Sequence, residues 1–445
     1  MSYSQKRFHR RQFNLLAGLA LTTPWTAQSF AQSETRRPAP SDRIRVGIVG
    51  LGARGFNLLD ELLKLNDIDV IAVCDVDRLH YRDNAWGKGH SFGREAARDY
   101  LVKKGRAKPK SLVDFRELCS LSDVDAVVVA TPDHWHALCT LTALRQGKDV
   151  YCEKPVTHWF SEGIAVCREV EKQQAVFQTG SQQRSDPEFR RAVELVRNGV
   201  LGKIQRIEVG LPAGYESAQG DSAIKPPPVD LDYDFWCGPA PKLPYTRARH
   251  HRWWRGHRAY GGGVLMDWIG HHNDIAHWAL DIDASGPSIV EAVNWQFPAT
   301  EIYNTPWHYT IRCQYSNGIT SVISDGNLLG TKLIGENGWL HVTRGRLTTS
   351  DPRWSAGEFV AGAFALPVSN GHMRNFIDCV RSREACVATA EIGHRSITPG
   401  HLGYVSQALG RPLQWDALNQ TIINDAEAER LLRDGTYRTP WSMTI

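Results

Sequence analysis

The chain has 445 residues, enough for roughly two to three domains, and its 42% hydrophobic and 22% charged residues exclude a disordered or fibrous protein. Lys and Arg number 52 against 48 Asp and Glu, but residues 1–31 contain four basic residues and no acidic one, so the remainder is balanced at 48 against 48. A basic excess confined to the N-terminus gives no support to nucleic-acid binding or to a polyanionic substrate.

The N-terminus resembles a twin-arginine export signal. Arg10 and Arg11 precede an uncharged, mostly apolar stretch over residues 15–21, and the segment ends at Ala31. This stretch is shorter than the roughly 20 apolar residues of a membrane-spanning helix, and no later stretch reaches that length. We therefore predict a signal peptide over residues 1–31, a periplasmic mature protein and no transmembrane segment in it. A basic leader without a targeting role is the alternative.

Residues 32–43 are polar and are predicted to form a linker, after which strand and helix patterns alternate. Short unbroken apolar strands separated by helices indicate a parallel sheet covered on both faces. We predict a doubly wound Rossmann domain for binding NAD(P) over residues 44–184. Its predicted strands are 44–49, 70–74, 126–130, 150–152 and 175–179, and its predicted helices are 56–64, 137–145 and 161–172.

From about Pro187 the pattern changes to one helix and then long strand-like segments, with a hairpin signal at residues 316–318. We predict a C-terminal α+β domain over residues 185–445 with an open, mainly antiparallel sheet. The Pro-rich segments at 225–228 and 238–244 are expected in a long excursion over that sheet. The predicted helix is 188–197, and the predicted strands are 204–210, 307–315, 319–324 and 338–343.

A GxGxxG run directly follows the first predicted strand and opens the first predicted helix. There the glycines permit a tight turn, close approach of the backbone to a pyrophosphate and close packing of helix on strand, and the helix N-terminus offers amide donors. Asp75 ends the next strand and is predicted to bind a ribose diol, which favours NAD over NADP; Arg54 and Arg78 keep NADP as the alternative. Glycines that serve only the turn are the other alternative. The predicted cofactor-binding residues here are Gly50, Gly52, Ala53, Arg54, Gly55 and Asp75.

Two predicted strand ends carry unusual residues, at the edge where ligands of an open parallel sheet bind. Thr131-Pro132 follows one strand, with His136 downstream, and Glu153-Lys154 follows the next before a proline. A lysine at the mouth of a cofactor cleft can hydrogen-bond a substrate hydroxyl and favour its alkoxide. A surface lysine paired with Glu153 is the alternative.

A third cluster follows three consecutive glycines, in a segment predicted to be helical. Asp267, His271, Asp274 and Trp278 recur at helical spacing on one face. Because a carboxylate one turn before a histidine can fix the imidazole tautomer, Asp267 and His271 are predicted to form an oriented base; a structural pair at a domain interface is the alternative. Upstream, residues 247–260 combine histidines and tryptophans with five arginines, which suits a polyhydroxylated ring.

A metal site is not predicted. Six histidines lie between His250 and His277, but no HExxH or comparable ligand spacing is present. The nine cysteines form no CxxC pair, so neither a zinc ribbon nor a disulfide scaffold is indicated. Metal binding by the histidine cluster is the alternative.

Together these motifs resemble those of the Gfo/Idh/MocA oxidoreductases over nearly all of residues 44–415. The resemblance implies NAD(P)-dependent oxidation or reduction of sugars and polyols, and a homo-oligomer, dimer or tetramer, often formed through the open sheet. By position, Lys154 matches the catalytic lysine, and Asp267 and His271 match the substrate-contacting acid and the proposed base. This chain has Ile269 where members usually have glycine. Further predicted cofactor contacts are Thr131, Pro132, His136, Glu153 and Lys154; the predicted substrate-binding residues are Lys154, Gln183, Arg184, Trp254, Asp267, His271 and His272.

Three functions are consistent with the sequence. The first is an oxidoreductase acting on a secondary hydroxyl with tightly held NAD, because an exported enzyme meets no recycling pool of free cofactor; sugar-to-sugar transhydrogenation is one form of it. The second is a redox-neutral NAD-dependent glycosidase that oxidises C3 transiently, eliminates the aglycone and adds water, although the YPTH-type motif of one such group is absent after Gly263. The third is a carbohydrate-binding protein without catalysis.

Overall fold

The computed structural model describes residues 42–82 and 89–444. The predicted signal peptide over residues 1–31, and all but the last two residues of the predicted linker over residues 32–43, lie outside the described residues. The described chain forms two large sheets with covering helices, which confirms the predicted α/β class.

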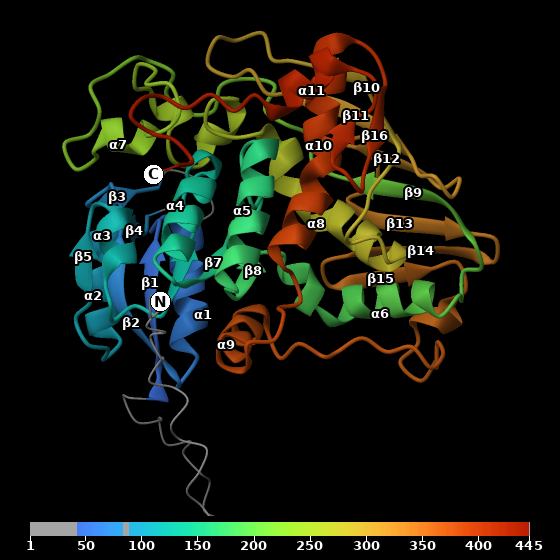
Figure 1. Cartoon of the computed structure of the whole chain (residues 1–445), viewed down its shortest axis with the longest axis horizontal. Helices are drawn as coiled ribbons and strands as arrows, with labels where there is room; N and C mark the ends of the chain where they lie inside the picture. Colours follow the sequence, from blue (N-terminus) through green and yellow to red (C-terminus); the bar gives the residue numbers. More distant parts are fainter. Residues whose placement is uncertain (1–41, 83–88, 445) are drawn as a thin grey trace, which may run out of the picture. The chain divides into compact units, whose positions relative to one another are not determined.

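A parallel sheet of six strands forms in the first part of the chain (Figure 1). Each neighbouring pair runs parallel, as the alternation of strand and helix patterns predicts. One short strand, β5, was not predicted. In spatial order the strands are β5 (Lys110–Leu112), β2 (Ile68–Cys74), β1 (Ile44–Val49), β6 (Ala126–Val129), β7 (Asp149–Cys152) and β8 (Phe177–Thr179).

Side chains of this sheet alternate between two hydrophobic clusters, one on each face. Val127 and Val129 of β6 belong to one cluster, whereas Val128 belongs to the other. The helices of the first cluster that belong to this half of the chain are α3 (Phe115–Ser120), α4 (Asp133–Arg145) and α5 (Phe160–Gln173), and this cluster continues into the helices of the second sheet. The helices in the second cluster are α1 (Ala53–Leu63), α2 (Arg94–Lys103) and α9 (His372–Ser382). The first sheet and these helices form the first layer of the molecule. Because α9 comes from the second half of the chain, both halves contribute to this layer (Figure 1).

The second sheet has nine strands and is mostly antiparallel, as predicted; only β9 and β12 pair in parallel. The predicted hairpin turn joins β11 to β12, where the amide of Tyr315 donates to the carbonyl of Ile319. In spatial order the strands are β15 (Arg346–Thr349), β14 (Gly338–Thr343), β13 (Gly330–Gly335), β9 (Ile204–Gly210), β12 (Thr320–Ser324), β11 (His308–Gln314), β10 (Ile289–Gln296), β16 (Leu413–Asp416) and β17 (Thr421–Ile422).

Three helices cover one face of the second sheet: α6 (Pro187–Arg197), α8 (Gly263–Leu280) and α10 (Ala390–Leu409). On the opposite face, Arg312, Val322, Glu208 and Lys332 lie side by side across four strands and are exposed or half-buried. A last helix, α11 (Ala426–Arg433), packs on α10 and α5.

Helix α8 is the central element of the second layer. Its 18 residues run from Gly263 to Leu280, and the residue that follows, Asp281, adopts a left-handed conformation with φ 59°. Most of its side chains are buried, because it packs on α10, α6, β9 and β13. Polar residues on the buried part of such a helix need partners.

The excursion over residues 211–262 contains α7 (Tyr233–Cys237) and reaches the first layer rather than staying over the second sheet. Its Leu231 forms a β-bridge with Asp77, and the amide of Arg78 donates to the carbonyl of Asp230 at 2.8 Å. Trp135 on α4 donates from Nε1 to the carbonyl of Trp236 at 2.9 Å. The excursion therefore lies against the carboxyl ends of the first-layer strands.

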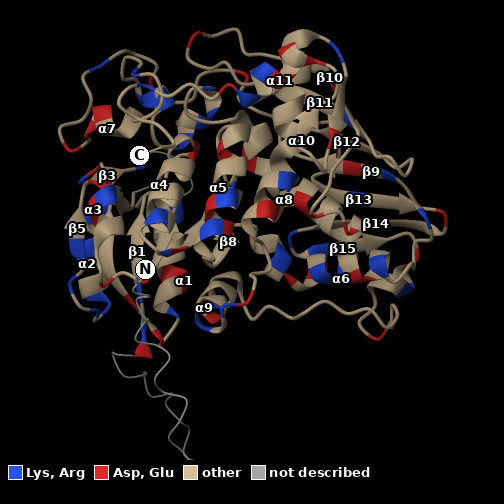
Figure 2. Cartoon of the chain, viewed as in Figure 1, with Lys and Arg blue, Asp and Glu red and all other residues tan. Residues whose placement is uncertain are grey.

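Acidic and basic residues are interspersed along the helices and strands (Figure 2). In the part of the chain that the structure describes, no helix combines the length and apolar character needed to cross a bilayer. All nine cysteines are free thiols, and all but Cys167 are buried.

Candidate active site

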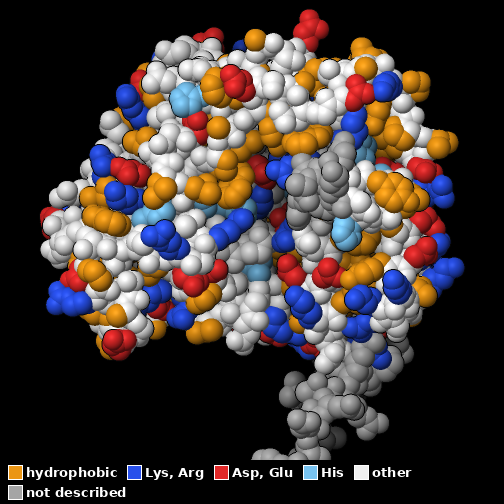
Figure 3. Space-filling view, turned by 180° about the vertical axis from the view of Figure 1, so that it is seen from behind, with side chains coloured by type: hydrophobic (Ala, Val, Ile, Leu, Met, Phe, Trp, Pro, Cys, Tyr) orange, Lys and Arg blue, Asp and Glu red, His pale blue; other side chains and the backbone are white. Residues whose placement is uncertain are grey.

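A cavity of about 740 Å³ opens where the strands of the first sheet end, between that edge, the excursion and α8. Lys, Arg and His side chains gather around a hollow near the middle of the face seen in Figure 3. Of the predicted site residues, the cavity is lined by Gly50, Gly52, Ala53, Arg54, Asp75, Thr131, Pro132, His136, Glu153, Lys154, Gln183, Trp254, Asp267 and His271.

The glycine-rich loop joins β1 to α1 and has the steric properties that a dinucleotide requires. A Cβ on Gly50, whose φ is +88°, would lie 2.6 Å from the backbone of Ala130 and Thr131. A Cβ on Gly55 would lie 2.0 Å from the carbonyl oxygen of Gly50, so helix and loop pack without a side chain there. At Gly52 a Cβ would meet nothing within 4 Å. The protein therefore leaves open the one position where a pyrophosphate would approach, which fits a bound dinucleotide.

Asp75 lies at the end of β2 beside this loop. Its carboxylate accepts hydrogen bonds from the amide of Leu51 at 2.6 Å and from the amide of Asp77 at 2.9 Å. Burial raises the pKa of Asp75, and the neighbouring Asp77 acts in the same sense. The two amides hold the carboxylate at the cavity wall, in the place that the predicted ribose contact needs.

Lys154, just after β7, is not a surface lysine paired with Glu153. Its ammonium group donates to the carboxylate of Asp267 on α8 at 2.5 Å and to the backbone carbonyl of the same residue at 2.9 Å. Burial alone would raise the pKa of Asp267, but Arg255 and Lys154 outweigh it and lower the pKa to about 2. Glu153 instead accepts from Arg54 at 2.8 Å. The lysine and the aspartate thus form a charged pair between the two layers.

The predicted pairing of Asp267 with His271 is wrong. Arg344, in the turn between β14 and β15, lies 3.1 Å from His271 Nε2. Since a guanidinium only donates, Nε2 accepts and Nδ1 carries the hydrogen in this arrangement. Burial, with Lys154 and Arg344 nearby, holds the pKa of His271 well below its usual range. The ring is therefore neutral and is oriented by an arginine, because Asp267 is already held by two cations.

His136 holds the site together through two backbone carbonyls. Its Nδ1 lies 2.7 Å from the carbonyl of Pro155, and its Nε2 lies 2.9 Å from that of Thr131. These carbonyls belong to the segments after β6 and β7, and the ring lies between them; a neutral ring donates its one N–H to one of the two. Burial lowers the pKa of His136, although both carbonyls oppose this effect.

Two predicted substrate-binding residues are not brought to the cavity wall. Arg184 is 4% exposed and forms salt bridges with Asp274 at 2.8 Å and with Asp283 at 2.6 Å. His272 is 0% exposed and holds the carbonyl of Gly210 through Nδ1 at 2.7 Å. Consecutive residues of a helix point about 100° apart, so His271 and His272 face different surroundings. Arg184 and His272, which were predicted to bind substrate, instead connect parts of the second layer.

Several cavity residues were not predicted. Arg255 and Tyr215 come from the excursion, Trp268 from α8 and Arg344 from a turn between strands. The arginine- and tryptophan-rich run over residues 247–260 carried a signal for Arg255. For Arg344 the sequence carries none, because a single arginine in a hairpin turn is usually solvated.

Comparisons with protein families match both layers of the chain. Residues 44–181 match the Gfo/Idh/MocA model described as an oxidoreductase family with an NAD-binding Rossmann fold, and residues 186–443 match the model of its C-terminal alpha/beta domain. The chain belongs to the Gfo/Idh/MocA oxidoreductase family. In this family the first layer is the NAD-binding domain, which agrees with the glycine-rich loop and with a nicotinamide cofactor.

Curated relatives of this Gfo/Idh/MocA protein include Glycosyl hydrolase family 109 proteins. One from Shewanella baltica is 28% identical over 215 residues, which cover 44% of each chain. Another from Shewanella putrefaciens is 26% identical over 215 residues with the same coverage. The matched segment spans less than half the length of these relatives.

Solved structures share the fold along most of the chain. The aldose-aldose oxidoreductase from Caulobacter crescentus, solved with glycerol, has a TM-score of 0.59 and 16% identity, covering 84% of this chain and 99% of that chain. The WlbA dehydrogenase from Bordetella pertussis, in complex with NADH and UDP-GlcNAcA, has a TM-score of 0.60, 16% identity and the same coverage.

Proposed function

We propose that this protein is an NAD-dependent oxidoreductase that acts on a secondary hydroxyl group of a sugar, polyol or glycoside. The observation that carries the proposal is that one cavity is lined by the glycine-rich loop together with Lys154, Asp267 and His271. A dinucleotide site and acid-base groups must face each other across the reacting carbon. Two of the solved structures with the same fold, an aldose-aldose oxidoreductase and a dehydrogenase in complex with NADH and UDP-GlcNAcA, support this class of substrate.

In this mechanism Lys154 hydrogen-bonds the substrate hydroxyl and stabilises negative charge on its oxygen. Its two bonds to Asp267 leave a third ammonium hydrogen for the substrate. Arg255, whose Nε lies 3.2 Å from Asp267 Oδ1, keeps this carboxylate ionised and the lysine in place. A bound nicotinamide ring supplies the acceptor for the hydride that leaves the carbon.

His271 is proposed to take the hydroxyl proton. It is neutral because its pKa is held well below the usual range, so a ring lone pair is available at neutral pH. The nearby cations Lys154 and Arg344 favour the alkoxide; because they also oppose the imidazolium form, the proton does not stay on His271. Proton uptake at Nε2 requires Arg344 to leave that nitrogen, and the proton is then passed on to solvent.

NAD is proposed over NADP. The two arginines that could receive a 2′-phosphate are both paired with carboxylates: Arg54 with Glu153 at 2.8 Å, and Arg78 with Asp230 at 2.7 Å. Asp75 adds negative charge at the predicted ribose contact, which would repel the phosphate.

A redox-neutral glycosidase is the second candidate, favoured by the Glycosyl hydrolase family 109 relatives. There the same oxidation at C3 acidifies the C2 proton, a base removes it, the aglycone leaves, water adds and C3 is reduced again. A product made in heavy water by this route carries deuterium at C2. Product without solvent deuterium at C2 would eliminate this candidate.

The first experiment is to denature the purified protein and quantify released dinucleotide by mass spectrometry. Near-stoichiometric NAD or NADH is expected. The native protein is then mixed with a panel of sugars and glycosides, and reduced nicotinamide is followed by its near-ultraviolet absorbance. A protein that is empty and fails to bind added NAD would refute both catalytic candidates in favour of a carbohydrate-binding protein.

Export and self-association also remain proposals. The signal lies outside the described residues, and fusion of residues 1–41 to a folded reporter tests export through the twin-arginine route. The open face of the second sheet, which carries Arg312 and Lys332, is the proposed interface of a dimer or tetramer. Sedimentation of the purified protein measures the oligomeric state.

A further inference from the structure

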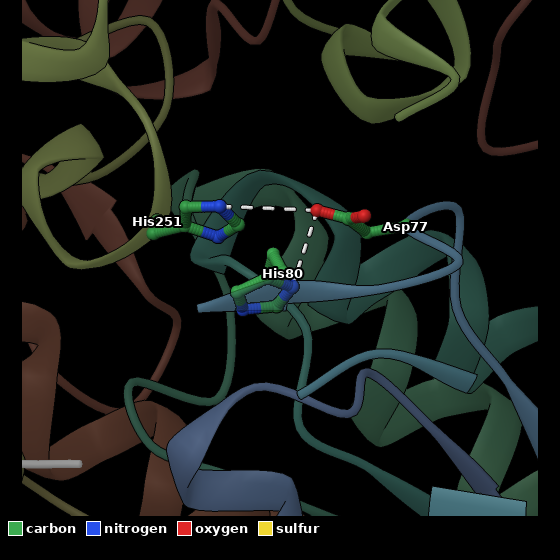
Figure 4. Close-up of side chains that lie close together, drawn as sticks. All are labelled: Asp77, His80 and His251. Carbon is green, nitrogen blue, oxygen red and sulfur yellow. Dashed lines mark ion pairs between the residues drawn. The ribbon is translucent and has the colours of Figure 1, made fainter. Parts of the chain in front are cut away.

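Asp77, His80 and His251 form a compact cluster at the cavity wall near Asp75 (Figure 4). Asp77 and His80 follow β2, and His80 opens the short strand β3 (His80–Tyr81), which pairs with β4 (Ser91–Phe92). His251 belongs to a 3₁₀ turn of the excursion. The cluster thus joins the first layer to the excursion, and the proposed reaction does not use it.

The three side chains have the spacing of metal ligands. One ligand atom from each lies within 4.8 Å of the other two. Asp77 Oδ2 is 3.1 Å from His80 Nδ1 and 3.8 Å from His251 Nε2. Ligands around a tetrahedral zinc ion, at about 2.0–2.1 Å from it, lie roughly 3.3 Å from one another. Small rotations of these side chains would therefore bring all three atoms to one ion.

Buried polar atoms of this cluster lack partners. Asp77 is 4% exposed, and its Oδ1 has no hydrogen-bond partner among the described residues. His80 Nδ1 is also buried without one, because its approach to Asp77 lacks hydrogen-bond geometry. Unpaired buried polar atoms cost free energy, and a cation would satisfy both of these. The two imidazole rings are stacked with centroids 3.8 Å apart, so binding one ion requires them to turn out of this stacked arrangement.

The surrounding charges select the class of metal. Two arginines, Arg247 and Arg82, carry positive charge close to His251. The same arginines oppose a cation held by charge alone. Two imidazoles and one carboxylate suit zinc, cobalt or nickel rather than calcium or magnesium, which prefer oxygen ligands.

We propose that Asp77, His80 and His251 bind one divalent transition metal ion of the zinc class, with its fourth coordination position open to the cavity. This replaces the prediction that the chain has no metal site. The ion fastens the excursion to the first layer, and the proposal holds whichever reaction the enzyme catalyses.

The test is titration of chelator-treated full-length protein with Co²⁺, with and without saturating NAD. We expect one equivalent bound, visible absorption of a four-coordinate Co²⁺ ion and a higher melting temperature. His251→Ala and Asp77→Asn should each weaken Co²⁺ binding at least about 10-fold and abolish the melting shift. His257→Ala, which removes another imidazole of the excursion, should behave as the wild type.

Melting curves of the metal-free variants establish that they are folded. Equal Co²⁺ affinity in the wild type, His251→Ala and Asp77→Asn would overturn the site. Loss of the bound Co²⁺ when NAD is added would also overturn it, because the three side chains would then be cofactor contacts. Retention of one Co²⁺ with NAD bound supports it.

Discussion

Two acidic residues of α8, Asp267 and Asp274, lie seven residues apart and have opposite fates. Asp267 is 18% exposed in its side chain, meets two cations at the cavity, and has a pKa lowered to about 2. Asp274 is fully buried, and burial raises its pKa to about 6 although Arg184 opposes this. At the cavity, two cations keep Asp267 ionised. In the interior, Asp274 is paired with the buried Arg184.

The geometry of the two pairs explains the difference in role. Arg184 meets Asp274 through Nε and Nη2 and Asp283 through Nη1 and Nη2, and its guanidinium lies 5.1 Å from the Trp278 ring. Little of its donor capacity remains for a ligand. Lys154 makes two hydrogen bonds, both to Asp267, at the edge of an open cavity. The pair at the cavity therefore keeps an ammonium hydrogen for a ligand, as the proposed mechanism requires, whereas the interior pair does not.

Removing Lys154 from its ion pair with Asp267 should have the largest effect on catalytic activity. Lys154→Ala removes the group that stabilises the alkoxide, so we expect kcat to fall by about 10²- to 10⁴-fold, with the melting temperature nearly unchanged. Steady-state kinetics with the substrate found in the sugar panel measure this. Lys172→Ala, at a lysine whose side chain is 70% exposed, is the matched control. Ligand binding and biological role unaffected by Lys154→Ala would favour the binding protein.

Removing Arg184 from its ion pair with Asp274 should instead lower the stability of the protein. Arg184→Met leaves two carboxylates without their cation, one of them fully buried, and should lower the free energy of unfolding by about 3–5 kcal/mol. Denaturant titration measures this loss. The folded fraction should keep its KM, because Arg184 does not line the cavity. A raised KM with unchanged stability would restore the original prediction that Arg184 binds substrate.

Removing the arginine that orients His271 should give a smaller effect. In Arg344→Gln, the lost positive charge raises the pKa of His271, so the acidic limb of the kcat/KM profile should move to higher pH. A pH series from acid to neutral measures the shift. Arg346→Gln, in the same hairpin, is the control. An unmoved limb would mean that His271 is not the group that takes the proton.

Local patterns in the sequence predicted most of the fold. The strand over residues 44–49 and the hairpin between β11 and β12 were predicted because they rest on β-branched runs and turn residues. Packing of α9 against the first sheet was not, because it depends on contacts far apart in the chain. The excursion was assigned to the wrong layer for the same reason.

The site was predictable where chemistry follows a strand end. Lys154 and Asp75 each come directly after a strand, so topology alone brings them to one edge. The ion-pair partners of Asp267 and Arg184 could not be predicted, because the sequence offers several oppositely charged residues for each. His271 and Asp267 have ideal helical spacing, yet a lysine from another element takes the carboxylate.

Asp133 is a further carboxyl group near Lys154 and Asp267, and replacing it should change stability less than replacing Arg184 does. Asp133 on α4 is 1% exposed, and burial raises its pKa to about 7 although Arg255 opposes this. Because this pKa is raised above the unfolded value, its contribution to stability is complete below about pH 4 and is lost as the pH rises through 7. Asp133→Asn should remove that loss and stabilise the protein at pH 8 relative to pH 5 by about 2–3 kcal/mol compared with the wild type. Melting temperatures at the two pH values measure this.

The control is Glu162→Gln, at another buried carboxyl whose pKa is raised to about 7 but which does not line the cavity. It should show a similar trend in stability without changing kcat. If the pH dependence of Asp133→Asn equals that of the wild type, Asp133 is ionised, and the cations at Asp267 also neutralise it.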